Sequence, residues 1–138
     1  MEPGRDVNDL SRRVIGAAIE VHKGLGPGYQ ESFYEEAMAF ELSQAGIDFE
    51  RQRIFSVTYR GHTVGEGRVD FLIGSMLILE IKAVEKLQPV HKAQVISYLK
   101  ATSCDVGLLI NFNESLLRSG IQRIVYTNSL RLGVFAAN

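Results

Sequence analysis

The sequence predicts an α/β protein with a central mixed β-sheet flanked by helices. Segments with apolar residues at helical spacing surround shorter apolar segments that are typical of strands. Some of these strands carry apolar residues at successive positions, and such strands usually have both faces covered by helices. The length of 138 residues suits one domain, which we expect to span residues 1–138.

Two helices are expected before the first strand. Gly24 is a plausible stop for the first helix, and the loop GLGPGYQE leads into a second helix that starts near residues 30–32. This helix runs to about Ala45, with Gly46 as its C-cap. The apolar residues expected to face inward are Leu10, Val14, Ala17, Ala18 and Val21 from the first helix and Tyr34, Ala37, Met38, Leu42 and Ala45 from the second.

Three strands, a helix and two further strands follow. Phe55 to Tyr59 alternates apolar and polar residues, which is typical of a strand with one buried face, and residues 60–62 form a turn. The remaining elements are strands over 64–73 and 76–84, a helix over 90–101 with Val95, Ile96 and Leu99 toward the core, and strands over 106–112 and 121–126.

Three charged residues interrupt the apolar hairpin RVDFLIGSMLILEIKAVEK. Glu80 and Lys82 are two positions apart, so both side chains leave the same face of a strand. Asp70 joins them if residues 74–76 form the turn, because that register pairs Asp70 with Glu80. A two-residue Gly-Ser turn would place the two acids on opposite faces. We favour the longer connection on chemical grounds.

Two carboxylates on one side of a sheet form a hard-oxygen site that suits Mg²⁺ or Mn²⁺. A lysine beside them can orient a water molecule or stabilise negative charge that develops on phosphate. Metal-assisted phosphodiester hydrolysis needs such a set of residues. The alternative is a partly hydrated ion pair at a strand end without a chemical role, because short charged patterns often arise by accident.

A wider pattern surrounds these residues. The motif D-x9-E-x-K is preceded by an acidic helix and followed by a helix with Gln94 and Tyr98, and GYQESFY covers residues 28–34. In this order, the motifs resemble the PD-(D/E)XK nuclease superfamily and, within it, the GxxExxY proteins. The resemblance extends through VDFLIGSMLILEIKAVEKL, HKAQVISYLK and VGLLINF. It implies a restriction-endonuclease-like core.

The resemblance also implies roles for individual residues. Asp70 and Glu80 correspond to the metal-binding acids, with the carbonyl of Ile81 as a further ligand, and Lys82 to the lysine that assists the attacking water. Val69 stands where the motif has proline, which leaves the acid in place.

The first core helix of the family supplies another acid, to which Glu31 corresponds. A glutamate at a helix start is equally explained by the positive end of the helix dipole, and Glu35, one turn later, can replace it. Gln94 and Tyr98 form a Q-x-x-x-Y pattern similar to that of RecB-type and lambda-exonuclease-like members, where these residues support the site and contact substrate. His91 lies on the same helical stripe. The alternative is a polar surface stripe with a tyrosine packed against the core.

Two functions are therefore considered. The first is a Mg²⁺- or Mn²⁺-dependent nuclease that acts on nucleic acid, with DNA favoured over RNA. The second is a catalytically inactive nuclease-fold module for binding or assembly. The net charge of −1 lacks the basic field of a dedicated nucleic-acid binder, so we expect local cationic contacts. The small size and weak overall charge leave little surface to grip a duplex, so we also expect a homo-oligomer. The candidate cations are Arg51, Arg53, Arg68, Lys86, Lys92 and Lys100.

Composition excludes several other classes. The chain has no apolar run long enough to cross a membrane and no apolar stretch typical of a secretory signal, so we expect a cytoplasmic protein. The single cysteine, Cys104, excludes an internal disulfide and a four-cysteine iron–sulfur cluster, and it is expected to be buried. His22 and His62 have no zinc-type spacing and are expected on the surface.

Overall fold

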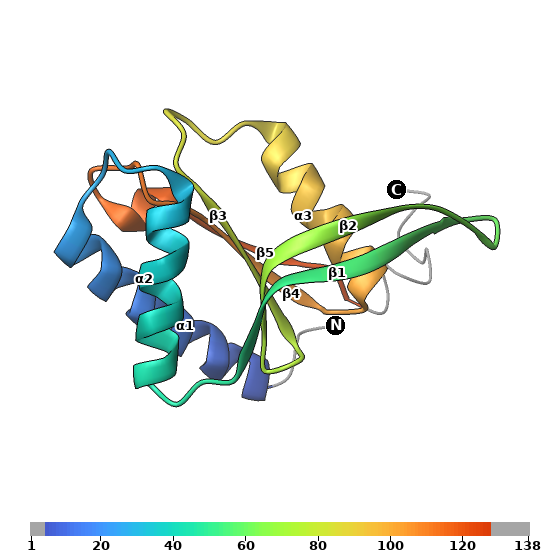
Figure 1. Cartoon of the computed structure of the whole chain (residues 1–138), viewed down its shortest axis with the longest axis horizontal. Coiled ribbons are helices and arrows are strands. Elements are labelled where there is room, and N and C mark those ends of the chain that lie inside the picture. Colours follow the sequence, from blue (N-terminus) through green and yellow to red (C-terminus); the bar gives the residue numbers. More distant parts are fainter. Residues whose placement is uncertain (1–4, 128–138) are drawn as a thin grey trace.

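The structure, a computed structural model, describes residues 5–127. Within them a five-stranded sheet with the order β1-β2-β3-β4-β5 is flanked by three α-helices, which confirms the predicted fold class (Figure 1). The elements are α1 (Arg5–Leu25), α2 (Glu31–Gln44), β1 (Phe49–Tyr59), β2 (His62–Ile73), β3 (Leu77–Lys82), α3 (Pro89–Thr102), β4 (Val106–Asn111), the 3-10 helix η1 (Leu117–Gly120) and β5 (Ile121–Val125).

The sheet is mixed, as the sequence predicts. β1, β2 and β3 are joined antiparallel, β3 and β4 run parallel, and β5 returns antiparallel to β4. A parallel pair needs a crossover connection, and α3 supplies it between β3 and β4. This connection carries α3 across the sheet beside the charged end of β3.

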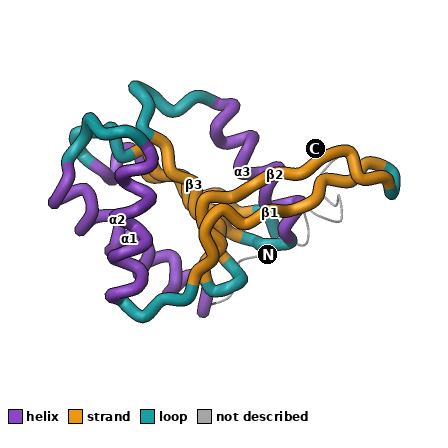
Figure 2. Tube along the Cα trace, viewed as in Figure 1, coloured by secondary structure: helices purple, strands orange, loops and turns teal. Residues whose placement is uncertain are grey.

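Helices cover both faces of the sheet (Figure 2). On one face, α1 and α2 pack against buried residues such as Phe71, Leu79 and Ile110. On the other face, Val95 and Leu99 of α3 pack against Ile78 and other buried strand residues. β3 and β4 are buried on both faces, which explains their continuous apolar sequence.

The helices differ from the prediction at their ends. α1 continues past Gly24 to Leu25, and Gly26 is the residue that adopts a positive φ of 67° after it. Gly46 follows α2 with a φ of 71°, as expected for a residue that ends a helix. Ala45 was expected to face inward but is exposed, because it is already the cap residue beyond the last helical turn.

β1 and β2 form an arm, residues 54–68, that extends beyond the rest of the sheet (Figure 1). The prediction of one buried face from 55 to 59 holds only at Phe55, which is partly buried against the core, because Val57 is 40% and Tyr59 is 63% exposed. The strand also starts earlier, at Phe49. Both faces of the arm are largely exposed because β3 pairs with β2 only at residues 71–73.

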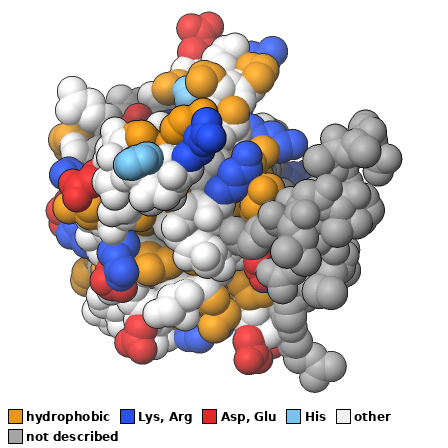
Figure 3. Space-filling model, turned by 90° about the vertical axis from the view of Figure 1, so that its right-hand side faces the viewer, with side chains coloured by type: hydrophobic (Ala, Val, Ile, Leu, Met, Phe, Trp, Pro, Cys, Tyr) orange, Lys and Arg blue, Asp and Glu red, His pale blue; other side chains and the backbone are white. Residues whose placement is uncertain are grey.

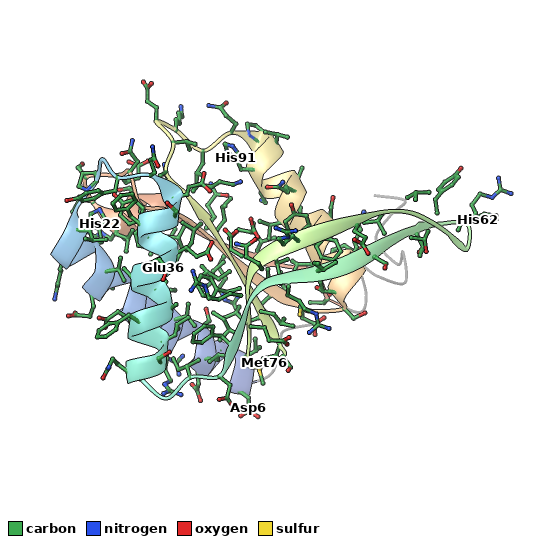
Figure 4. All side chains as sticks on the ribbon, viewed as in Figure 1. Asp6, His22, Glu36, His62, Met76 and His91 are labelled. Atoms are coloured by element: carbon green, nitrogen blue, oxygen red, sulfur yellow. The ribbon has the colours of Figure 1, made fainter. Side chains whose placement is uncertain are left out.

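The tip of the arm is a tight turn. Arg60 and Gly61 have φ values of 50° and 85°, which is typical of a two-residue type I′ hairpin turn. His62, which was expected in the turn, instead begins β2 and pairs with Tyr59. Its side chain lies at the far end of the arm, well away from Glu36 and His91 (Figure 4).

The remaining elements are close to their predicted positions. β3 is shorter than predicted, because Met76 belongs to the preceding turn and the chain leaves the sheet after Lys82. The bounds of α3, β4 and β5 differ from the prediction by one residue at one or both ends, and Ile96 is only partly buried. η1 was not predicted.

Candidate active site

The connection between β2 and β3 decides where the two acids lie. Ile73 pairs with Leu77, so residues 74–76 form the turn, and the N–H of Met76 donates to the carbonyl of Ile73 over 3.1 Å. Gly74 and Ser75 both have positive φ values, of 57° and 58°. The longer connection favoured from the sequence is confirmed, and it brings Asp70 opposite Glu80.

Where the regular β2–β3 ladder ends, the side chains of Asp70 and Glu80 continue the hydrogen bonding between the two strands. The N–H of Asp70 donates to Oε1 of Glu80 over 2.8 Å, and the N–H of Ile81 donates to Oδ2 of Asp70 over 2.8 Å. Each carboxylate is therefore held by the main chain of the opposite strand. The two acids are fixed beside each other at the point where the strands separate.

Burial makes this pair electrostatically unfavourable. Glu80 is only 4% exposed, and its burial, together with the negative charge of Asp70, raises its pKa to about 8. The pKa of Asp70 is also raised, chiefly by burial, although the hydrogen bond from Ile81 opposes the shift. At neutral pH the pair therefore favours a bound proton or a nearby cation.

Lys82 and Gln94 lie on the same side of the site. Nζ of Lys82 donates to Oε1 of Gln94 over 3.3 Å, which connects the end of β3 to α3. The positive charge of Lys82 is close enough to oppose the raised pKa of both Asp70 and Glu80, although burial dominates that pKa. Two of the predicted site residues are thus in direct contact, within electrostatic range of the acids.

Tyr98 lies one helical turn beyond Gln94 and is half-buried. Its ring packs edge-on against Phe55 of the arm, with 5.0 Å between the ring centroids. Burial raises the pKa of its hydroxyl, and the negative charges of Glu80 and Asp70 raise it further. Tyr98 therefore both packs against the arm and lies within electrostatic range of the acids.

His91, on the same stripe of α3, has a structural role at the helix start. Its Nδ1 accepts the N–H of Gln88 over 2.8 Å, in a capping arrangement at the first turn.

Cys104 and His22, which were given no role in the site from the sequence, differ in how well they match the prediction. Cys104 is buried as predicted, whereas His22 is only half-exposed, because its Nε2 contacts the carbonyl oxygen of Glu114 at 2.7 Å.

The two acids of α2, Glu31 and Glu35, differ in their connection to the Asp70–Glu80 pair. Glu31 is the first residue of α2 and is exposed, and its charge adds to the raised pKa of Glu80 after larger contributions from burial and Asp70. Glu35 accepts the side-chain amide of Gln52 over 2.8 Å, and the same amide donates to Asp70 over 3.3 Å. Gln52 was not identified from the sequence, because only the register of β1 against β2 places it opposite Asp70.

The donor set fits a magnesium-type cation in part. Glu80 offers a buried carboxylate and Asp70 a half-buried one, and the pKa values of both are raised. Within residues 5–127, no three or more His, Cys, Asp or Glu side chains form a group that could hold a metal ion. Mg²⁺ commonly binds through one or two carboxylates together with water and substrate phosphates, so two acids are a sufficient protein contribution.

The chain matches a known protein family over most of its length. A family model described as the PD-(D/E)XK nuclease superfamily matches residues 8–124. The chain belongs to the PD-(D/E)XK nuclease superfamily. PD-(D/E)XK nucleases generally use divalent metals.

Two solved structures share the fold of this PD-(D/E)XK chain. One is SSO0001, with a TM-score of 0.55 and 20% sequence identity over 77% of this chain and 55% of that one. The other is an alkaline exonuclease, LHK-Exo, from Laribacter hongkongensis, with a TM-score of 0.53 and 13% identity over 99% of this chain and 77% of that one. The chain thus spans little more than half the length of SSO0001. A search of curated proteins found no significant match.

The candidate cations of this nuclease fold are not equally available. Arg51 forms ion pairs with Glu35 and Glu36 at 2.8 and 2.6 Å, and Arg53 pairs with Glu50 at 2.8 Å. Their charges are therefore already compensated within the protein. The others, Arg68, Lys86, Lys92 and Lys100, are exposed.

The end of the molecule that carries the arm tip shows hydrophobic side chains together with Lys, Arg, Asp and Glu side chains (Figure 3). Exposed hydrophobic residues of the arm include Ile54, Val57, Tyr59 and Val64. No helix in the described part of the chain is long and apolar enough to span a membrane.

Proposed function

We propose that the chain is a divalent-metal-dependent nuclease that hydrolyses phosphodiester bonds, with DNA preferred to RNA and Mg²⁺ or Mn²⁺ as the metal. The observation that carries the proposal is the placement of the buried Glu80 beside the half-buried Asp70, with both carboxylates held by main-chain hydrogen bonds. Their raised pKa values indicate that the pair favours a proton or a cation at this place. The motif GYQESFY and the pair Gln94 and Tyr98 support assignment to the GxxExxY proteins and to a RecB- or lambda-exonuclease-like subtype.

In this proposal, Asp70, Glu80 and the carbonyl of Ile81 hold the metal, and Glu31 or Glu35 completes the acidic surroundings. When bound, such a metal polarises the phosphate and lowers the pKa of a bound water molecule. The main-chain hydrogen bonds to Asp70 and Glu80 fix their carboxylates before substrate arrives, which lowers the cost of reorganisation.

Lys82 and the residues of α3 supply the other contributions. Gln94 orients Nζ of Lys82, which places an ammonium group where it can attract water and stabilise negative charge on a phosphate oxygen. Tyr98 keeps its hydroxyl proton at neutral pH, since the ordinary pKa of tyrosine is 10 and burial raises the pKa of Tyr98 above it, so it can donate a hydrogen bond to the substrate backbone. These roles make Glu31, Asp70, Glu80, Lys82, Gln94 and Tyr98 the proposed catalytic set.

A second candidate function is a binding or assembly module with the nuclease fold. The main-chain hydrogen bonds of Asp70 and Glu80 favour it, since each acid already has a structural role in joining β2 to β3. The exposed apolar residues of the arm also support a homo-oligomer in either case. A sedimentation experiment that finds only monomer at working concentration would remove the oligomer from the proposal.

A substrate panel separates the two functions. The wild-type protein is incubated with single- and double-stranded DNA and RNA of the same sequence, with Mg²⁺, with Mn²⁺ or with chelator. The nuclease proposal expects metal-dependent cleavage, with DNA cut faster than RNA. Faster cleavage of RNA would overturn the substrate preference, and nucleic-acid binding without cleavage in any metal would favour the binding module. The cytoplasmic location stays a prediction from the sequence.

A further inference from the structure

Gln52 has an unusual backbone conformation in the middle of β1. Its φ is 51°, although it is not glycine and lies within a strand. Its neighbours Arg51 and Arg53 pair with Phe71 and Val69, so Gln52 lies opposite Asp70. Positive φ values are uncommon for such residues, and they cluster at functional sites. The unusual conformation of β1 at Gln52 therefore lies opposite Asp70, where the regular pairing of β2 with β3 has ended.

The conformation brings two successive side chains to one acid. In a regular strand, neighbouring side chains point to opposite faces. Here, Arg51 donates to Oε2 of Glu35 through Nε at 3.1 Å and through Nη2 at 2.8 Å, and Nε2 of Gln52 donates to Oε1 of Glu35 at 2.8 Å. Both oxygens of the Glu35 carboxylate are thereby occupied. The positive φ of Gln52 is what allows this arrangement.

The same amide nitrogen reaches Asp70. Nε2 of Gln52 donates to Oδ1 of Asp70 at 3.3 Å, while Oδ2 of Asp70 accepts the N–H of Ile81 at 2.8 Å. Hydrogen bonds to both oxygens fix the plane of the Asp70 carboxylate. A neutral amide can bridge two carboxylates without adding charge, and Arg51 compensates the charge of Glu35.

We infer that Gln52 is a positioning residue for the site, because its amide holds the Asp70 carboxylate in the orientation for metal binding and connects it to Glu35 on α2. The inference rests on the proposed function and adds a residue and a helix to it. α2, β1 and β3 then meet at one carboxylate, so the geometry of Asp70 depends on all three elements. Partners that orient a metal ligand typically contribute about 10- to 100-fold to metal affinity or activity.

Two substitutions separate the amide from the backbone conformation. Gln52→Gly removes the amide but accommodates the positive φ, so any loss reports on the side chain. Gln52→Asn keeps an amide on a shorter side chain and also tolerates this conformation. The matched control is Ser103→Gly, at an exposed residue with a φ of 62° at the end of α3, away from the site.

The experiment measures Mn²⁺ binding by calorimetry, thermal unfolding in chelator, and cleavage. For Gln52→Gly we expect a Kd for Mn²⁺ about 10-fold higher or more and a matching loss of cleavage at low Mn²⁺. Gln52→Asn should fall between Gln52→Gly and wild type, and Ser103→Gly should match wild type. Excess Mn²⁺ should restore much of the cleavage by Gln52→Gly, since the catalytic groups themselves are intact.

The possible failures are distinguishable. If the wild-type protein binds Mn²⁺ and cleaves, and Gln52→Gly has the same Kd for Mn²⁺, this inference is overturned and the proposed function stays in place. A lower melting temperature in chelator with an unchanged Kd would assign Gln52 a structural role only, which also overturns it. A wild-type protein that neither binds Mn²⁺ nor cleaves would overturn the proposed function together with the inference.

Discussion

The N–H of Asp70 donates to Oε1 of Glu80 over 2.8 Å, so the main chain of one acid holds the side chain of the other. The reverse connection runs from the N–H of Ile81 to Asp70. Truncating either acid to alanine would remove a link between β2 and β3 as well as a negative charge. The isosteres Asp70→Asn and Glu80→Gln keep an acceptor oxygen, so they separate charge from fold more cleanly.

The first prediction concerns pH. Glu80 has an ordinary pKa of 4.5 and a folded pKa of about 8, so between these values the folded state binds more protons than the unfolded state. Stability without metal must therefore fall as the pH rises from 4.5 to about 8, and the raised pKa of Asp70 acts in the same direction. We expect the melting temperature in chelator to fall by several degrees across this range.

Glu80→Gln should flatten that dependence, because its amide does not titrate. Circular dichroism melts of wild type and variant at several pH values provide the measurement. Wild-type stability that rises with pH through this window would contradict the assigned burial and charge of Glu80.

The second prediction concerns metal addition. Mn²⁺ or Mg²⁺ should raise the melting temperature above pH 8, where Glu80 is mostly ionised, since a ligand at 100 times its Kd stabilises the folded state by about 2.7 kcal/mol. Asp70→Asn and Glu80→Gln should lose most of this response. Glu66→Gln, at an exposed acid of the arm, serves as the control and should keep it. An equal metal response in all four proteins would place the cation elsewhere.

The third prediction separates metal binding from chemistry. Lys82→Ala should leave the Mn²⁺ Kd nearly unchanged but lower kcat by about 100-fold, the scale of losing one group that stabilises developing charge. Gln94→Ala should have a smaller effect, because it removes only the partner that orients Lys82. Lys23→Ala, at an exposed lysine of α1, is the control. Steady-state kinetics at saturating Mn²⁺ would reveal the contrast, and an unchanged kcat in Lys82→Ala would exclude the role given to its amine.

The fourth prediction concerns the base of the arm. A Cβ at Gly67 would lie 2.3 Å from Cζ of Phe55, the ring that packs against Tyr98, whereas a Cβ at Gly65 would meet nothing within 4 Å. Gly67→Ala should therefore displace the Phe55 ring and cost about 1–3 kcal/mol of stability through overpacking. Gly65→Ala should be near neutral. Denaturant unfolding of the two variants compares them directly, and equal stabilities would show that the ring moves aside without cost.

Much of the site was predictable because its residues follow a spacing that the chain geometry preserves. Glu80 and Lys82 share a strand, Gln94 and Tyr98 share a helical face, and the turn that brings Asp70 opposite Glu80 was favoured on chemical grounds. The fold class followed from the buried character of β3 and β4. The shared strand and the shared helical face follow from local periodicity, which can be read from the sequence, whereas the turn rested on a chemical preference.

Other features depend on relations between elements and could not be predicted. The alternation from 55 to 59 is the same for a half-buried strand and for an arm that extends into solvent, so the exposure of Val57 and Tyr59 was missed. The positive φ of Gln52 has no signal in residue periodicity. Asn111 also escaped notice, although its buried side chain bonds both the N–H and the carbonyl of Val84 and fixes the chain beyond Lys82.

The central claim, that Asp70 and Glu80 form the metal centre of a nuclease, is tested most directly by the rate at which a labelled DNA is cleaved. Wild type, Asp70→Asn and Glu80→Gln are compared in Mn²⁺ and in chelator, after circular dichroism shows that all three are folded. We predict cleavage by wild type in Mn²⁺ only, and a loss of at least about 100-fold in both variants. Cleavage that survives chelation, or that continues at the wild-type rate in both variants, would contradict the claim.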